Sequence, residues 1–311
     1  MEHAPQMVII QKNPRSGSGW RAHQLQRLTS RLEELGLKPV VYSDREQIGA
    51  ELSQQSVREQ LRCLVAAGGD GTIDDMINRF PGFPLAILAM GTENLLAKHF
   101  SSPSDGKQVA EMIAAGHIRK LDLGVAGQLR FAVMASCGFD AEVVERAHAA
   151  RKGRITKLHY LKPILSTILF HRRIPLKVTS ADLPEPMSCE MAVIANLPRY
   201  ASNLPITPEA RDDDGLFSVC LIRKATPLRL IGHSLQGFLL RAIRSKNLFR
   251  FETRLLKITA EHPVAVQADG DPVSKTPLEF RVLPQALDLI VPQHLAHTTL
   301  AKEYVKITAS H

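Results

Sequence analysis

The stretch Leu64–Met76, LVAAGGDGTIDDM, joins an apolar run to a turn that holds three glycines and one carboxylate. The apolar run predicts a buried strand, and the residues after the glycines predict a helix. A helix that begins directly after a strand presents unpaired N–H groups and partial positive charge, which suit a phosphate. Because glycine permits positive φ and close approach of the backbone, we expect Gly68, Gly69 and Gly71 to bring N–H groups to a phosphate.

Asp70 stands inside this turn, and its carboxylate cannot bind a phosphate directly. It must instead hold a metal ion, a ribose hydroxyl or a backbone N–H. We expect a Mg²⁺ ion that bridges to phosphate, because this ion prefers oxygen ligands and commonly shares them with a nucleotide. The alternative is a tight turn in which Asp70 caps the helix that follows.

Two further loops of this kind follow predicted strands. The loop NPRSGSG follows the strand candidate Met7–Gln11, and the loop MGTEN follows the candidate Pro84–Ala89. In a parallel sheet, ligands bind beyond the carboxyl ends of the strands, where such loops gather. One glycine loop alone favours a structural turn, but three loops at strand ends favour a phosphate site. The GGDGT turn does not fit the common nucleotide motifs G-x-x-x-x-G-K-[ST] and G-x-G-x-x-G.

The pattern of strands and helices changes near Leu121. Before it, strand and helix candidates alternate, which is typical of a parallel sheet covered by helices on both faces. After it, short strand candidates are separated by Pro, Asp and Gly turns, which predicts a mainly antiparallel β region. We therefore expect an α/β domain that binds a nucleotide (residues 1–120), a β domain (121–293) and a C-terminal tail (294–311) that could pack back on the first domain.

Composition and charge narrow the range of partners. The chain of 311 residues has a formal net charge of +8, which favours nucleotides, nucleic acid or an anionic membrane as partners. Aromatic residues make up only 5%, which argues against stacking on nucleic-acid bases. The four cysteines are widely spaced, which predicts buried free thiols in a reducing cytosol. No apolar run approaches the ~18 residues that a transmembrane helix needs.

The motifs together resemble the diacylglycerol kinase catalytic family, which includes bacterial lipid kinases and sphingosine kinases. Gly68–Thr72 is similar to the family's central G-G-D-G-T and is unbroken. The other similar segments are Asn13-Pro14 with Ser16-Gly17, Met90–Asn94 with Ala97, Leu121–Gly124 with Phe131, Gly138–Ala141, Pro208 to Gly215, and Gln267–Pro272. The resemblance covers most of the chain.

This resemblance implies a Rossmann-like N-terminal domain and a C-terminal β-sandwich domain that binds the lipid substrate. It also implies that ATP with Mg²⁺ lies between the domains and that a lipid hydroxyl is phosphorylated. By match to the family's loops, the residues expected to bind the nucleotide are Asn13, Ser16, Gly17, Gly68, Gly69, Asp70, Gly71, Thr72, Gly91, Thr92 and Asn94.

The same resemblance assigns roles to carboxylates of the second half. Asp269 matches the family's D-G-E aspartate, which implies a general base, since an aspartate carboxylate is ionised at neutral pH and can accept a proton. From the residues alone, the segment around Asp269 is an ordinary hairpin turn. Asp214 is the expected metal ligand beside Asp70, by match to a family loop that supports a second Mg²⁺. The sequence departs from the family at Leu95 and Ser218, where the usual residue is Asp.

Two basic stretches, residues 146–173 and 223–250, contain no Asp or Glu and carry apolar residues at helical spacing. A basic amphipathic helix is typical of proteins that bind an anionic membrane surface. The alternative is a helix that packs its apolar side on the β domain. We expect a lipid alcohol and an anionic membrane surface as partners, no nucleic acid, and a cytoplasmic protein that associates peripherally with membranes; oligomerisation is left open. Pro163 is expected to break or kink the first helix near its middle.

Three functions remain open. The first is an ATP-dependent lipid kinase that transfers the γ-phosphate to a hydroxyl of diacylglycerol or of a sphingoid-base-like lipid. The second is a soluble-substrate kinase of the NAD kinase type, because those enzymes have a related G-G-D-G loop. The third is a non-catalytic protein that binds a nucleotide or a lipid. The basic apolar stretches favour the first, and the intact Asp70 and Asp269 speak against the third.

Overall fold

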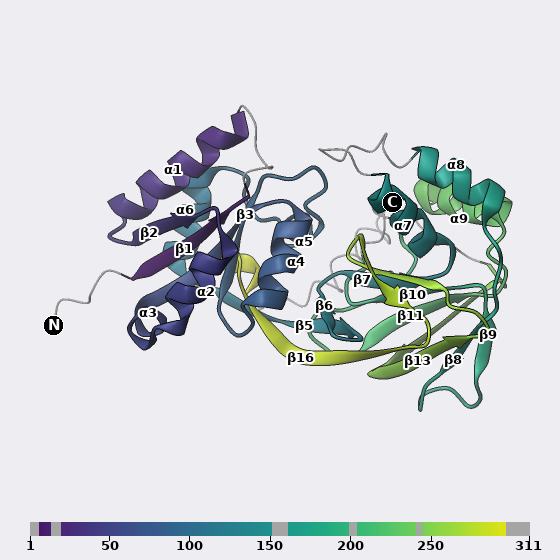
Figure 1. Cartoon of the computed structure of the whole chain (residues 1–311). Coiled ribbons are helices and arrows are strands. Elements are labelled where there is room, and N and C mark those ends of the chain that lie inside the picture. Colours follow the sequence, from purple (N-terminus) through teal and green to yellow (C-terminus); the bar gives the residue numbers. More distant parts are fainter. Residues whose placement is uncertain are drawn as a thin grey trace. The chain divides into compact units, whose positions relative to one another are not determined.

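The computed structural model describes residues 6–13, 20–150, 161–198, 204–240, 243 and 245–296. The chain divides into two compact units, which are described separately (Figure 1). Unit 1 comprises residues 6–121 and 285–296, and unit 2 comprises residues 122–284.

Unit 1 is built on a parallel sheet with the strand order β2-β1-β3-β4. The strands are β1 (Met7–Lys12), β2 (Lys38–Tyr42), β3 (Leu61–Gly68) and β4 (Leu85–Ala89). The central strands consist of continuous apolar runs, as expected where both faces of a parallel sheet are covered. The predicted parallel α/β region is therefore confirmed.

Helices cover both faces of this sheet (Figure 1). They are α1 (Trp20–Glu34), α2 (Arg45–Ser53), α3 (Gln55–Gln60), α4 (Asp70–Arg79), α5 (Leu95–His99) and α6 (Gly106–Ala115). Leu28 of α1 and Val109 of α6 join Val8 and Val65 of the strands in one core. Successive strand residues point to opposite faces, so buried Ile9 points to the other face of the sheet, and α2 and α4 contact β1 and β3.

Unit 2 contains two antiparallel sheets, as the resemblance implied. One has the order β12-β11-β10-β7-β14-β15, and the other joins β16, β13, β8 and β9, with the hairpin β5–β6 beside it. The strands are β5 (Ile118–Ala126), β6 (Leu129–Phe131), β7 (Met134–Cys137), β8 (Leu176–Thr179), β9 (Met187–Cys189), β10 (Met191–Ala195), β11 (Phe217–Ile222), β12 (Leu248–Thr253), β13 (Leu255–Ala260), β14 (Ala265–Ala268), β15 (Asp271–Lys275) and β16 (Leu278–Ile290).

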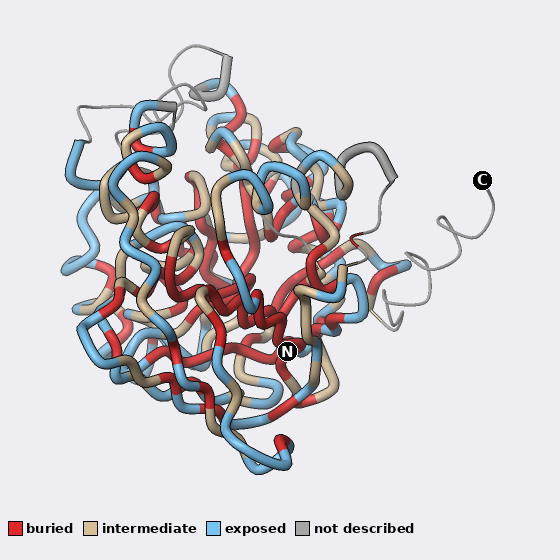
Figure 2. The backbone as a smooth tube through the Cα atoms, turned by 90° about the vertical axis from the view of Figure 1, so that its right-hand side faces the viewer, coloured by how far each residue is buried: buried red, intermediate tan, exposed pale blue. Residues whose placement is uncertain are grey.

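Buried apolar side chains from both sheets fill the core of unit 2. Figure 2 shows the buried stretches of the backbone in red. Ile194 belongs to the first sheet, and Val178 and Phe280 belong to the second. Phe131 stacks on Phe217 with ring centroids 5.7 Å apart. The second half is thus a β sandwich. All four cysteines are buried and free, as predicted, and burial raises the pKa of the Cys63 thiol to about 12.

Three helices lie outside the sheets of unit 2: α7 (Phe139–Ala149), α8 (Leu161–Phe170) and α9 (Pro227–Leu240). Pro163 was expected to break or kink the helix of the first basic stretch near its middle. In the structure α7 ends at Ala149, residues 151–160 lie outside the described residues, and Pro163 is the third residue of α8. The expected break or kink at Pro163 therefore stays a prediction. Among the described residues, no helix combines the length and the apolar character needed to cross a bilayer.

The division into units differs from the expected domains at one place. Residues 285–293 were assigned to the β domain, but in the structure they belong to unit 1. The reason is the length of β16, which has 13 residues. Its first residues pair with β13, and near its end Leu289 pairs in parallel with Leu85 of β4. Residues 297–311 of the expected tail lie outside the described residues.

Candidate active site

The GGDGT turn joins β3 to α4, and Gly69 is the residue before the first helical turn. A Cβ atom on Gly68 would lie 2.1 Å from the Oγ1 atom of Thr72. A Cβ atom on Gly91 would lie 2.4 Å from the Cα atom of Gly69. Gly68, Gly69 and Gly71 do not have positive φ, so the expectation that glycine serves here by adopting positive φ is wrong. Glycine is needed in this turn because the GGDGT and MGTEN loops touch backbone to backbone.

Asp70 links the same two loops through hydrogen bonds. Its Oδ2 atom accepts the backbone N–H of Asn94 at 2.8 Å, and its Oδ1 atom accepts that of Leu95 at 2.7 Å. Of the partners considered for this carboxylate, the structure thus shows backbone N–H groups. Asp70 caps α5 rather than the helix in which it lies. Burial raises its pKa and the charge of Glu93 adds to this, while the two N–H groups act in the opposite direction.

Asn94 closes the MGTEN loop on itself. Its Oδ1 atom accepts the N–H of Gly91 at 2.9 Å, and its Nδ2 atom donates to the carbonyl of Gly91 at 3.0 Å. Asn94 adopts the left-handed conformation with φ of 50°, which asparagine tolerates better than most residues. Thr92 and Gly71 are exposed at the surface of these loops. The loop therefore has a fixed frame and an accessible outer side.

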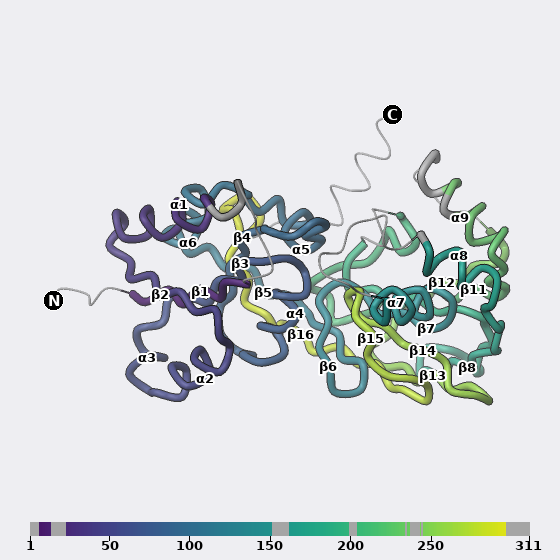
Figure 3. The backbone as a smooth tube through the Cα atoms, turned by 45° about the horizontal axis from the view of Figure 1, so that its top comes forward, coloured from purple at the N-terminus to yellow at the C-terminus, as the bar shows by residue number. Residues whose placement is uncertain are grey.

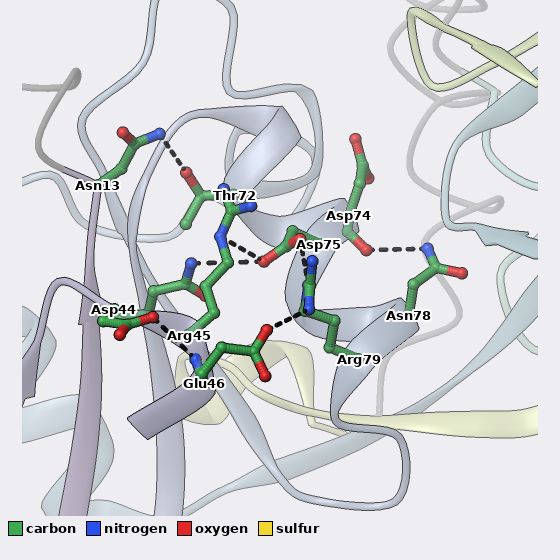
Figure 4. A network of polar contacts seen from close by, with 10 residues as sticks. Asn13, Asp44, Arg45, Glu46, Thr72, Asp74, Asp75, Asn78 and Arg79 are labelled. Carbon is green, nitrogen blue, oxygen red and sulfur yellow. Dashed lines mark hydrogen bonds and ion pairs between the residues drawn. The ribbon is translucent and has the colours of Figure 1, made fainter. Parts of the chain in front are cut away.

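The first loop is joined to this arrangement through Asn13. Its Nδ2 atom donates to the Oγ1 atom of Thr72 at 3.0 Å (Figure 4). One turn further along α4, Asp75 accepts Nε2 of Gln11 at 3.4 Å and pairs with Arg45 at 3.0 Å. Ser16 and Gly17, predicted to bind the nucleotide, lie outside the described residues. The structure thus brings Asn13, Gly68–Thr72 and Gly91–Asn94 together in unit 1.

The contact between the glycine loops predicts a large difference between two Gly→Ala substitutions. Gly91→Ala should destabilise unit 1 by about 1–3 kcal/mol, because the added methyl would meet the backbone of Gly69. Gly49→Ala is the matched control. Gly49 lies inside helix α2, and a Cβ atom there would lie 3.8 Å from Phe80, an ordinary van der Waals contact. Alanine there should raise stability by about 0.5–1 kcal/mol. Urea unfolding of both variants measures the difference, and equal stabilities would contradict the close contact.

Asp269 is held at the turn between β14 and β15 by three backbone N–H groups. Its Oδ2 atom accepts from Ala132 at 2.6 Å, and its Oδ1 atom accepts from Val133 at 3.0 Å and from Met134 at 2.8 Å. The residue has φ of 48°, an uncommon conformation for aspartate that is found where surrounding structure enforces it. These contacts fix the orientation of the carboxylate.

Gln267 forms a second layer beneath this turn. Its Oε1 atom accepts the N–H of Gly270 at 2.9 Å, and its Nε2 atom donates to Ser136 at 2.9 Å and to Asp140 at 3.0 Å. The Ser136 hydroxyl donates to Asp140 at 2.6 Å. Gln267 is buried, so this network holds the turn of Asp269 against β7 and α7. Sequence reasoning missed this function, although Gln267 opens the QADGDP motif.

Asp214 lies in a loop of unit 2, and Asp122 of β5 binds the same loop. Asp122 is buried, and its Oδ2 atom accepts the N–H of Gly215 at 2.6 Å. Asp214 accepts the N–H of Leu216 at 3.0 Å. Burial raises the pKa of Asp214, and the charges of Glu252 and Asp122 add to this. In the described part of the chain, no group of three or more His, Cys, Asp or Glu residues is arranged to hold a metal ion.

The chain thus has a two-domain class of fold: a parallel-sheet α/β unit whose two glycine loops touch, followed by a β sandwich with carboxylates held by backbone N–H groups. Residues 6–126 match the family model described as the diacylglycerol kinase catalytic domain. Residues 133–291 match the model described as the YegS C-terminal NAD kinase beta sandwich-like domain. The chain belongs to the diacylglycerol kinase catalytic family, as its motifs suggested.

The chain aligns with known relatives over nearly their whole length. The chain is 22% identical over 300 residues to a protein of Staphylococcus carnosus named diacylglycerol kinase, covering 94% of this chain and 97% of that one. It is 26% identical over 303 residues to a protein of that name from Mycobacterium tuberculosis, covering 92% and 96%. A crystal structure of a diacylglycerol kinase from Bacillus anthracis has the same fold, with a TM-score of 0.70, 20% identity, and coverage of 95% and 99%.

Proposed function

We propose that this member of a kinase family is an ATP-dependent lipid kinase that transfers the γ-phosphate of ATP to a lipid hydroxyl. The observation that carries the proposal is the Asp70 bridge, which holds two glycine loops together at the carboxyl end of the parallel sheet. Ligands bind at this end of such sheets. The curated relatives named above are diacylglycerol kinases, which supports a lipid alcohol as substrate.

The residues of unit 1 fit the phosphates of a nucleotide. Gly71 lies in the first turn of α4, so its N–H group has no acceptor within the helix. Gly71 and Thr92 are exposed, and Asn13 is fixed beside them through Thr72. These are the features of an anion site at a helix start. The remaining predicted residues, Ser16 and Gly17, belong to the same proposal.

The carboxylates fit a Mg²⁺ ion only in part. Magnesium bound with a nucleotide takes most of its ligands from phosphate and water, so one or two protein carboxylates suffice. Asp70 is the proposed ligand of the ion bound with the nucleotide. Asp214 is the proposed ligand of a second ion, which the neighbouring negative charge of Asp122 suits. When bound, the ion would neutralise charge on the transferred phosphoryl group.

Asp269 is the proposed proton acceptor for the lipid hydroxyl. The three N–H groups fix the orientation of the carboxylate, and an aspartate that is ionised, as is ordinary at neutral pH, can accept a proton. As the hydroxyl oxygen bonds to the γ-phosphorus, the bond from that phosphorus to the bridging oxygen of ADP breaks. The proton of the hydroxyl passes to Asp269. Gln267 and Asp140 keep the turn in place during this step.

A second candidate is a kinase for a soluble substrate. It is favoured by one observation, the match of residues 133–291 to a domain described as NAD kinase beta sandwich-like. The many exposed apolar side chains of α8 and α9 in unit 2 favour the lipid instead.

One assay separates these functions. The full chain is incubated with ATP labelled on the γ-phosphate and with a total lipid extract in detergent, and in parallel with NAD. We expect label in the lipid fraction and its dependence on Mg²⁺. Label in NAD would establish the second candidate. Binding of ATP without transfer to either substrate would instead indicate a protein without catalysis.

A further inference from the structure

In the described part of the chain, twelve large apolar side chains are exposed. Seven of them lie on two helices, α8 and α9. The exposed fractions are 75% for Leu169, 68% for Phe170 and 83% for Leu228, the highest of this group. We define the α8–α9 apolar surface by its six most exposed members, Leu165, Leu169, Phe170, Leu228, Ile231 and Leu235. The two helices lie next to each other in unit 2 (Figures 1 and 3).

The exposed residues follow the period of a helix. Leu165 and Leu169 are four residues apart, and Leu228, Ile231 and Leu235 are three and four apart. Each set therefore forms one stripe along its helix. An ordinary surface helix turns such a stripe toward the core, but here the stripes face solvent.

The inner side of α8 is already held by α7. His171, just after α8, contacts Glu142 with its Nδ1 atom 2.5 Å from Oε2, and its ring meets Phe139 edge-on at 5.3 Å. Thr167 on the helix is buried. Because this side is anchored, α8 cannot roll to bury Leu169 without breaking these contacts.

Glu190 connects the end of α8 to the start of α9. It accepts the N–H of Ala225 at 2.7 Å and pairs with Arg173 at 3.7 Å. Arg173 follows α8 by three residues, and Ala225 precedes α9 by two. The link therefore sets the most exposed residues, at the end of α8 and the start of α9, at the same end of the two helices.

Basic residues surround this apolar surface. Residues 161–173 and 223–236 contain no Asp or Glu. The exposed cations in these segments are Lys162, Arg172, Arg173, Arg223, Lys224 and Arg229. Glu142 and Glu190 contact the segments that follow α8 and precede α9, and they are engaged with His171 and Arg173. An apolar surface with a basic rim matches the boundary between acyl chains and anionic headgroups.

We infer that the α8–α9 apolar surface docks on an anionic lipid bilayer. A second copy of the chain fits less well, because two such faces would bring their basic rims together. The inference deepens the proposed function, since it gives a lipid kinase access to a substrate that resides in a membrane. It stands on the exposure and charge of unit 2, independently of the nucleotide site.

Binding to vesicles without ATP or substrate lipid tests this inference separately from catalysis. The full chain should sediment with vesicles of phosphatidylglycerol and phosphatidylcholine and much less with phosphatidylcholine alone. The variant with Leu169→Ser, Phe170→Ser and Leu228→Ser should bind about a hundredfold more weakly. The matched control, Leu129→Ser with Leu255→Ser, removes half-exposed leucines from strands of the same unit and should bind as the wild type does.

A charge variant completes the test. Arg223→Gln, Lys224→Gln and Arg229→Gln together should weaken binding to anionic vesicles by about a hundredfold, from about 1 kcal/mol for each cation, and flatten its dependence on salt. Wild-type binding by the triple serine variant would overturn the inference, as would failure of the wild type to bind anionic vesicles. Light scattering is measured alongside, and a wild-type dimer that the serine variant dissociates would assign this surface to self-association instead. Lost vesicle binding with retained kinase activity in the triple serine variant supports the inference and leaves the proposed function intact. A wild type that binds anionic vesicles but phosphorylates no lipid supports the inference and counts against the proposed function.

Discussion

Replacing Asp269 with Asn is expected to lower kcat roughly a thousandfold and to leave the affinity for ATP unchanged. The amide cannot accept the proton of the lipid hydroxyl. The Asp269 carboxylate accepts the backbone N–H groups of Ala132, Val133 and Met134. The NH₂ group of asparagine would therefore face at least one of these donors. We expect a loss of about 1–3 kcal/mol in the free energy of unfolding as well. Single-turnover kinetics, ATP binding and urea unfolding are measured on the same preparation.

The effect on catalysis must be separated from the effect on structure, and Asp140 provides the control. Asp140→Asn disturbs the same turn, because Asp140 accepts hydrogen bonds from Ser136 and Gln267. It should also cost about 1–3 kcal/mol in stability. It is expected to lower kcat by no more than about tenfold, since Asp140 takes no proton in the proposed step. Equal losses of kcat in the two variants would show that Asp269 acts only by holding the turn.

Strands of unit 1 were predictable because each is a short apolar run that ends in a glycine loop or a polar turn. The continuation of β16 was missed because Pro284 interrupts its pattern, and proline within a run argues against a strand. Here the strand passes from one unit to the other near that proline, so the expected end of the β domain was placed too late.

The site was predictable as a set of loops but not as a set of contacts. The partners of Asp70 lie 24 and 25 residues later in the chain, and those of Asp269 lie 135 to 137 residues earlier. No local pattern specifies which N–H groups a distant carboxylate will accept. The resemblance assigned chemistry to both carboxylates, whereas the structure shows that each also stabilises a turn. Gln267 illustrates the same limit, because its role depends on Ser136 and Asp140, which are distant in sequence.

Replacing Asp70 with Asn is expected to weaken ATP binding by about a hundredfold or more and to abolish phosphoryl transfer. Asparagine has nearly the same shape but only one acceptor oxygen. The backbone N–H of Asn94 or that of Leu95 therefore loses its partner and faces an NH₂ group. The contact between the GGDGT and MGTEN loops should loosen, because Gly69 and Gly91, whose backbones touch there, have no side chains that could hold the loops together.

The dependence on Mg²⁺ separates the two roles proposed for Asp70. If Asp70 acts mainly as a cap, the variant should bind ATP more weakly with or without Mg²⁺. If it acts mainly as a metal ligand, binding of free ATP should be unaffected and the Mg²⁺ concentration that gives half of the maximal gain in ATP affinity should rise. The hydrogen bonds to Asn94 and Leu95 favour the first outcome. Calorimetric titrations with ATP, with and without Mg²⁺, decide between them.

Asp44→Ala is the matched control for the loss of a cap in unit 1. The Asp44 side chain accepts the N–H of Glu46 at 3.0 Å at the start of α2, outside the glycine loops. Its removal should cost about 1 kcal/mol of stability and leave ATP binding unchanged. If Asp70→Asn destabilised unit 1 no more than Asp44→Ala yet lost ATP binding, the loss would arise at the loops themselves. If Asp70→Asn bound ATP as the wild type does, the nucleotide would not depend on this turn, and the proposed site in unit 1 would have to be abandoned.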